Sequence, residues 1–91
     1  MMRSIERTTK FKRDYKRERK IDPSLDAAFL AAIVLLADDD ELPKRLRDHS
    51  LGGQWKGYRD CHIRPDLLLL YSKEEGKLTL ARLESHSELF G

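Results

Sequence analysis

Apolar residues in the first third of the chain recur at helical spacing. In residues 10–20, Phe11 and Tyr15 lie one turn apart on one face and basic residues fill most other positions. A threonine directly before this segment, Thr8 or Thr9, is a good N-cap. The pattern predicts a first helix with one apolar contact line.

A second helix is predicted from Asp22-Pro23, because aspartate is a favoured N-cap and proline is favoured at the first helical position. This helix should end by Ala37, since the acidic residues 38–41 that follow are unfavourable at the C-terminal end of a helix dipole. Its apolar stripe consists of Leu25, Phe29, Ala32, Ile33 and Leu36.

The second half of the chain shows strand patterns. Residues 55–62 mix aromatic and polar side chains as in a half-exposed strand, and residues 67–71 form a continuous apolar run typical of a strand buried on both faces. Pro65 favours a tight turn between them. Residues 77–84 alternate, so that Leu78, Leu80 and Arg82 are expected on one face and Thr79, Ala81 and Leu83 on the other.

The remaining segments complete the predicted fold. Residues 4–7 suit an edge strand, whereas residues 42–54 are expected to form a loop and residues 85–91 a tail. The order strand-helix-helix-strand-strand-strand predicts a single α+β domain over residues 1–91, with two helices packed on one face of an antiparallel sheet.

Composition and charge restrict the compartment and the partner. The single cysteine cannot form an internal disulfide, and the sequence has neither a signal-peptide pattern nor an apolar run long enough to span a membrane. We therefore expect a cytoplasmic protein with no membrane partner. Residues 1–20 hold nine of the 18 Lys and Arg, whereas residues 21–42 hold six acids and no base. A basic face of this kind favours a polyanion or an acidic protein.

Chemistry-bearing residues should meet at one edge of the predicted sheet. In a three-strand meander, the end of the first strand, the start of the second and the end of the third lie together, which places His62, Asp66, Arg82 and His86 at the same edge. Such groups can cleave RNA without a metal or cofactor. A base removes the ribose 2′-hydroxyl proton, an acid protonates the leaving 5′ oxygen, and a guanidinium stabilises the charge on phosphate.

Other uses of these residues remain open. His62, Asp66 and His86 are also zinc-ligand types, although the chain lacks paired-cysteine and HExxH spacing. A lone histidine is more often a hydrogen-bonded structural residue than a catalyst. Possible phosphate contacts on the central hairpin, which are equally ordinary strand charges, are Lys56, Arg59 and Arg64.

His49 is not placed by this argument. It precedes the first meander strand and so starts at the opposite edge from His62, about 26 Å away for an eight-residue strand. Only a loop that folds back over the sheet would bring His49 to the other histidines.

Several motifs together resemble the YafQ branch of the RelE/ParE toxin superfamily. They cover almost the whole chain and are the helix segment KFKRDYKR from Lys10, DHSL from Asp48, WKGYRDCHIRPD from Trp55, and the ending from Arg82 to Gly91 with His86 and Leu89-Phe90-Gly91. The chain departs from the family in having Leu67 where an aromatic residue is frequent, and Ser50 where proline is common.

The resemblance implies a RelE-like bacterial type II toxin. Such a toxin is a small endoribonuclease that cuts messenger RNA, typically mRNA being translated on the ribosome, and is silenced by an antitoxin. The antitoxin would be a DinJ-like ribbon-helix-helix protein. The toxin would contact operator DNA only through this antitoxin. The family's catalytic positions fall on His49, His62, Asp66 and His86, with Arg82 and Phe90 in supporting roles.

The alternative function is that of the gyrase-directed ParE-like relatives, which act by protein contact without catalysis. These relatives have no need for titratable groups gathered at one sheet edge. Plain RNA binding without cleavage is a third possibility, for which salt-sensitive affinity and intact RNA are expected.

Overall fold

The computed structural model describes residues 2–90, and of Phe90 the backbone alone. Its sheet has the strand order β1-β5-β4-β3-β2. The predicted meander is formed by β3 (Arg59–Arg64), β4 (Leu67–Glu74) and β5 (Lys77–Glu84), and β1 (Ser4–Arg7) is an edge strand as expected. The strands pair antiparallel except β1, which runs parallel to β5. The expected α+β fold is thus confirmed, with one parallel pair that the strand patterns did not reveal.

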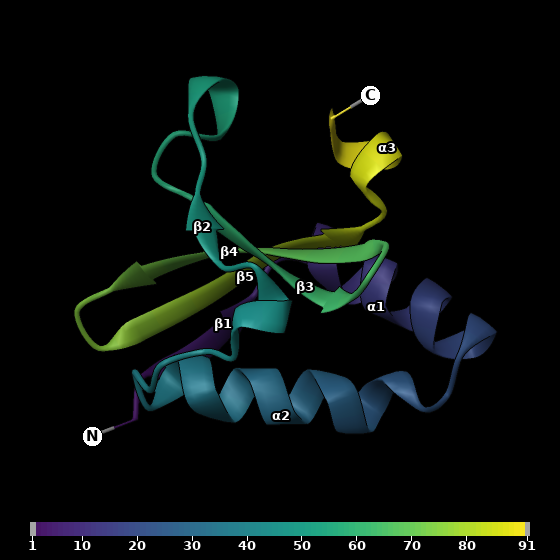
Figure 1. Ribbon diagram of the computed structural model, residues 1–91, viewed down its shortest axis with the longest axis horizontal. Helices are drawn as coiled ribbons and strands as arrows, with labels where there is room; N and C mark the ends of the chain where they lie inside the picture. The colour runs from purple at the N-terminus through teal and green to yellow at the C-terminus, as the bar shows by residue number, and fades with distance from the viewer. Residues whose placement is uncertain (1, 91) are drawn as a thin grey trace.

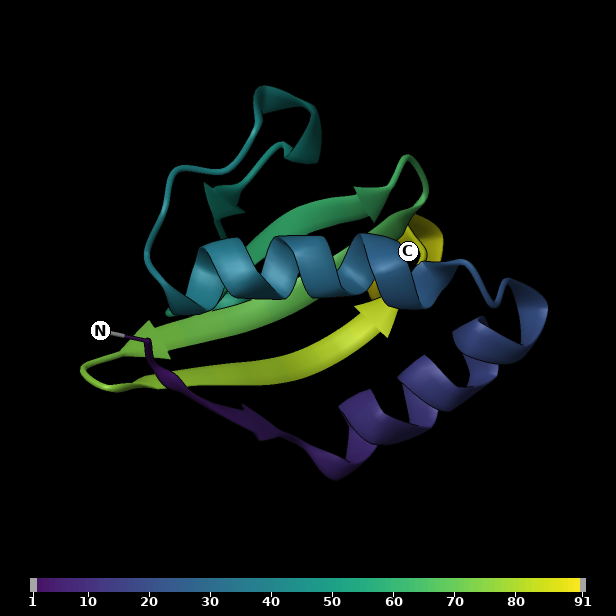
Figure 2. The same ribbon diagram turned by 90° about the horizontal axis from the view of Figure 1, so that it is seen from below.

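Two helices cover one face of the sheet, as predicted (Figure 1). Helix α2 (Leu25–Ala37) crosses the sheet, and α1 (Thr9–Ile21) continues from the β1 edge (Figure 2). The Thr8 hydroxyl caps α1 by accepting from the Phe11 amide at 3.0 Å. The Asp22 cap was wrong: Asp22 accepts from the amide and hydroxyl of Ser24 in a turn, and α2 begins at Leu25.

The main core lies between the helices and the sheet. The predicted stripe of α2 is buried there, except Phe29, which is partly buried and packs on Tyr15 with ring centroids 4.8 Å apart. In β5 the simple alternation was wrong. Tyr71 pairs with Leu80 and Leu70 with Arg82, so Ala81 is an extra residue in a bulge. The bulge returns Leu83 to the main core beside Leu78 and Leu80.

A smaller apolar cluster lies on the opposite sheet face. Leu68, Leu70 and Ala81 of the sheet pack with Leu89, and the partly buried Leu51, Trp55 and Tyr58 join them. Leu89 belongs to α3 (His86–Phe90), a short helix in the segment that was expected to be a tail. The Ser85 hydroxyl contacts the Glu88 amide at 3.4 Å, and the Glu88 carboxylate accepts from the Ser85 amide at 3.3 Å. This reciprocal pattern is a capping box, which starts α3 at His86.

The segment predicted as a loop, residues 42–54, contains short regular elements. They are the 3₁₀ turns η1 (Lys44–Leu46) and η2 (Gly53–Trp55) and the two-residue strand β2 (His49–Ser50). Leu46 is buried in the main core and anchors η1. Strand β3 therefore begins at Arg59 and not at Trp55. Over residues 2–90, the helices are all too short or too polar to cross a membrane.

Candidate active site

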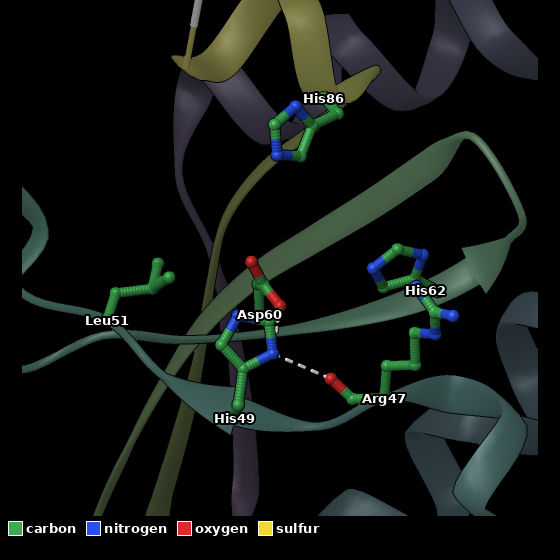
Figure 3. A pocket seen from close by; sticks show the side chains of 6 residues that line it. All are labelled: Arg47, His49, Leu51, Asp60, His62 and His86. Atoms are coloured by element: carbon green, nitrogen blue, oxygen red, sulfur yellow. Dashed lines mark hydrogen bonds and ion pairs between the residues drawn. The ribbon is translucent and has the colours of Figure 1, made fainter.

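A cavity of about 530 Å³ lies on the sheet face opposite α1 and α2, where it is lined by all three histidines of the chain (Figure 3). Helix α3 and the segment after β2 both rise from this face (Figure 1). The lining residues are Arg47, His49, Leu51, Asp60, His62 and His86. Residues distant in the sequence are thus brought to one site by the pairing of β2 with β3 and by the packing of α3.

Strand geometry explains the placement of the polar lining residues. Cys61 and Ile63 of β3 are buried in the main core, so Asp60 and His62, at alternate positions, face the other side of the sheet. The backbone pairing sets His49 of β2 opposite Asp60. The sequence left open whether His49 reaches the site. It does so because the loop folds back as a strand, β2, which pairs with β3.

His49 and Asp60 are in polar contact at the wall of the cavity, where the Asp60 side chain is buried and that of His49 is exposed. The Nδ1 atom of His49 lies 2.8 Å from the carbonyl oxygen of Arg47 and 3.1 Å from Oδ1 of Asp60. Since a carbonyl can only accept, this geometry assigns the hydrogen to Nδ1 and leaves Nε2 as the acceptor in the neutral ring. Asp60 is 2% exposed, and Oδ1 has no hydrogen-bond donor among the described residues.

Burial is the main influence on the pKa of the Asp60 carboxyl group. Desolvation raises the pKa of Asp60, because the charged form loses contact with water. The three nearby histidines act in the opposite direction when protonated, and lower the pKa of the same group. Asp60 is therefore coupled electrostatically to His49, His62 and His86, as expected for one site.

His62 is oriented in the same way as His49. Its Nδ1 lies 3.3 Å from the carbonyl oxygen of Pro65, in the turn after β3, so the hydrogen is assigned to Nδ1. His86 is the first residue of α3, and Leu89 on the same helix is buried against the sheet. The position of His86 thus depends on the packing of α3.

Two predicted site residues do not line this cavity. Asp66 is exposed in the turn beyond His62 and borders a separate cavity of about 240 Å³. Arg82 turns toward α1, where its Nε lies 2.8 Å from Oδ2 of Asp14, and it also contacts Glu84. Asp14 is 1% exposed and accepts from the Leu83 amide at 3.1 Å. The ion pair of Asp14 with Arg82 therefore connects α1 to the C-terminal end of β5, which is followed by His86.

The four expected substrate contacts are dispersed. Arg59 pairs with Asp48, with Nη2 and Oδ2 3.0 Å apart, and Arg64 pairs with Asp22, also at 3.0 Å. Lys56 is exposed and makes no ion pair with any residue from 2 to 90. The side chain of Phe90 lies outside the described residues.

Sequence reasoning missed Asp60 and Arg47. Asp60 was available from the pattern, since it lies two positions before His62 in a predicted strand and must share its face. Arg47 could not be found in this way because it lies in an irregular segment. It has a left-handed backbone, with φ of 49° and ψ of 43°, which directs its carbonyl group at His49.

In the part of the chain that the structure describes, no three His, Cys, Asp or Glu side chains are close enough together to hold a metal ion. The donor set around this cavity thus does not fit a preformed metal centre.

Comparison with known proteins identifies the family. The family model described as the bacterial toxin of type II toxin-antitoxin system, YafQ, matches residues 3–91. The chain belongs to the YafQ toxin family. The resemblance of its motifs to this family is therefore confirmed.

Relatives of this family cover the chain from end to end. The mRNA interferase toxin YafQ of Escherichia coli strain K12 is 33% identical over 100% of this chain and 99% of the relative. In the crystal structure of the E. coli DinJ-YafQ toxin-antitoxin complex, the matching chain is 34% identical with a TM-score of 0.87, and each chain covers 100% of the other. A copper-bound variant toxin from Helicobacter pylori is 34% identical with a TM-score of 0.91, covering 99% of this chain and 100% of that one.

Proposed function

We propose that this protein is an mRNA interferase, which inhibits translation by cleaving mRNA on the ribosome and is held inactive by an antitoxin. The observation that carries this proposal is the gathering of His49, His62, His86 and Asp60 around one cavity. The activity named for the E. coli relative supports the same conclusion. The three histidines supply the acid, the base and the positive charge that cleavage of a phosphodiester requires.

His49 is the proposed general base. With its hydrogen assigned to Nδ1, the neutral ring offers Nε2 to the ribose 2′-hydroxyl. The buried Asp60 carboxylate lies 3.1 Å from Nδ1 and stabilises the imidazolium that forms. The arrangement matches a general rule for catalytic bases, in which a third group orients and supports the base.

His86 is the proposed general acid, which protonates the leaving 5′ oxygen. It enters the cavity from α3, whereas His49 enters from β2 at the other wall (Figure 3). This separation allows proton removal and proton donation on either side of one phosphate. Protonated His62 contributes positive charge to that phosphate. The products would be a 2′,3′-cyclic or 3′ phosphate and a 5′-hydroxyl.

Asp66 and Arg82 have less direct roles in this proposal. Asp66 lies in the turn between β3 and β4, after His62. It would contact the ribose only when RNA occupies the surface outside the cavity. Arg82, held by Asp14, positions the end of β5 and thereby His86. Bound RNA and ribosome can tighten such contacts, because catalytic groups are often poorly aligned without substrate.

The proposed partners are ribosome-bound mRNA and a DinJ-like antitoxin. The E. coli relative was crystallised with DinJ, and it matches this chain over its whole length. Control of operator DNA would act through the antitoxin alone. The site of action would be the cytoplasm, where the ribosomes are.

The test is to express the wild type and the His86→Ala variant and to follow growth and mRNA 5′ ends. Ser87→Ala is a matched control, because Ser87 is the next exposed residue of the same helix and does not line the cavity. Wild type and Ser87→Ala should stop growth and produce new mRNA ends, and His86→Ala should do neither. Growth arrest with intact mRNA and inhibited gyrase would instead favour the ParE-like function.

A further inference from the structure

Next to the histidine cavity lies a second cavity of about 350 Å³ with a strongly basic lining. Its lining residues are Arg45, Arg47, His62 and Pro65. Arg47 and His62 line both cavities, so the two are adjacent. Figure 3 shows the Arg47 side chain extending from the β2 side toward His62, at the border between them.

We propose that Arg45 and Arg47 form a phosphate-binding subsite, which holds an RNA phosphate next to the one being cleaved. The proposal deepens the proposed function and rests on it, because the scissile phosphate is assumed to lie among the three histidines. Arginine suits this role, since its planar fork binds two phosphate oxygens and stays charged.

The first support is that the guanidinium groups of Arg45 and Arg47 have no partner within residues 2–90. Neither Arg45 nor Arg47 forms a side-chain hydrogen bond or ion pair within residues 2–90. Arg59, Arg64 and Arg82, by contrast, are each paired with a carboxylate. Arg47 is therefore the arginine at the histidine cavity with its charge available to a substrate.

The second support is that the backbone of η1 is held in place by the core. Buried Leu46 anchors the turn in the main core, so its neighbours Arg45 and Arg47 are held at the surface. The left-handed backbone of Arg47 at φ 49° is strained for a residue with a side chain. The residue in this strained conformation has two roles at the site. Its carbonyl group accepts from His49, and its guanidinium group has no partner within residues 2–90.

The charge around Arg47 indicates the direction of the RNA. On its other side, Arg47 borders a cavity of about 390 Å³ whose lining mixes the carboxylates Asp40, Glu41 and Asp48 with the cations Lys44 and Lys73. Among residues 2–90, none of the carboxylates lines the Arg45 cavity. A polyanion leaving the histidine cavity is thus favoured along Arg47 and Arg45.

The probe for this subsite is a fluorescein-labelled hexaribonucleotide with every 2′-hydroxyl methylated, which binds without being cleaved. Its affinity is measured by fluorescence anisotropy from 25 to 200 mM salt for the wild type, Arg45→Gln, Arg47→Asn and the double variant. Asparagine tolerates the left-handed backbone, so Arg47→Asn removes the charge and keeps the turn. Lys16→Gln on the exposed face of α1 is the control for the loss of one charge.

Each arginine substitution should weaken binding about 3- to 10-fold, and should lower the slope of log K against log salt by about 0.7, as expected for one lost phosphate contact on a single strand. Arg47→Lys should keep the slope and lose part of the affinity, because lysine keeps the charge without the fork. A double variant that binds like Lys16→Gln in both affinity and slope would overturn the subsite. So would a wild type with no measurable affinity for the RNA.

The same proteins are also assayed on ribosome-bound mRNA. Arginine-dependent binding together with a wild type that never cleaves would contradict the proposed function and would leave Arg45 and Arg47 as a phosphate-binding site without a role in cleavage. Cleavage that the double variant performs as well as the wild type would contradict the subsite alone.

Discussion

Replacing Asp60 by asparagine should slow cleavage without lowering the folding stability. The substitution keeps the size of the side chain and removes the charge 3.1 Å from Nδ1 of His49. Two unit charges 4 Å apart interact with about 1 kcal/mol in water and about 4 kcal/mol at the effective dielectric constant near a protein surface. Since the His49 side chain is 55% exposed, we take about 1 to 3 kcal/mol as the loss of imidazolium stabilisation.

This loss corresponds to cleavage slowed about 5- to 150-fold, because each 1.36 kcal/mol is a factor of ten in rate. The assay is single-turnover cleavage of ribosome-bound mRNA at saturating toxin. Folding stability should change in the other direction. Burial raises the pKa of Asp60 in the folded state, so ionisation of Asp60 at neutral pH opposes folding.

The sign of the pH dependence follows from that shift. The contribution of Asp60 is most favourable below its unfolded pKa and is lost as the pH rises through the raised folded pKa. Asp60→Asn should therefore match or exceed the wild type in thermal stability at pH 7.5, and its advantage should shrink as the pH is lowered toward 4. Wild-type cleavage rates in this variant would refute the role of Asp60. A lower Tm at pH 7.5 together with lower activity would indicate a structural role instead.

Three further substitutions test other parts of the structure. Asp14→Ala should lower the free energy of unfolding by about 2 to 4 kcal/mol in urea titrations, because it leaves Arg82 and the Leu83 amide without their buried acceptor; an unchanged midpoint would be inconsistent with that role. Leu89→Ala should cost about 2 kcal/mol and reduce cleavage, because α3 loses its contact with the sheet; full activity would show that His86 does not depend on this packing. The Cys61 thiol, whose pKa burial raises to about 12, should react with a thiol reagent at pH 8 only after unfolding, and rapid labelling of the native protein would contradict its burial.

The elements with long, regular patterns were predictable from the sequence. The apolar run 67–71 and the alternating segment 77–84 gave the strands that place His62 near the start of α3, and the chain order gave the layered α+β fold. Both strand predictions depend on hydrophobic patterns that extend over five or more residues.

The features that complete the site are too short or too local for periodicity. Strand β2 has two residues, yet its pairing with β3 is what brings His49 to Asp60. The bulge at Ala81 changes the faces of β5 through tertiary packing, for which no local pattern exists. Helix α3 did have a local signal, because the Ser-x-x-Glu capping box from Ser85 to Glu88 marks a helix start inside the segment expected to be a tail.

The most direct test of the account uses one altered ribose. A ribosome-bound mRNA carries a single 2′-deoxynucleotide on the 5′ side of a bond that the wild-type protein cleaves. If the imidazoles of His49 and His86 act on a 2′-hydroxyl and its phosphate, cleavage at that bond should vanish while cleavage at unmodified bonds continues and leaves 5′-hydroxyl ends. Continued cleavage at the modified bond, or 5′-phosphate ends, would contradict the mechanism.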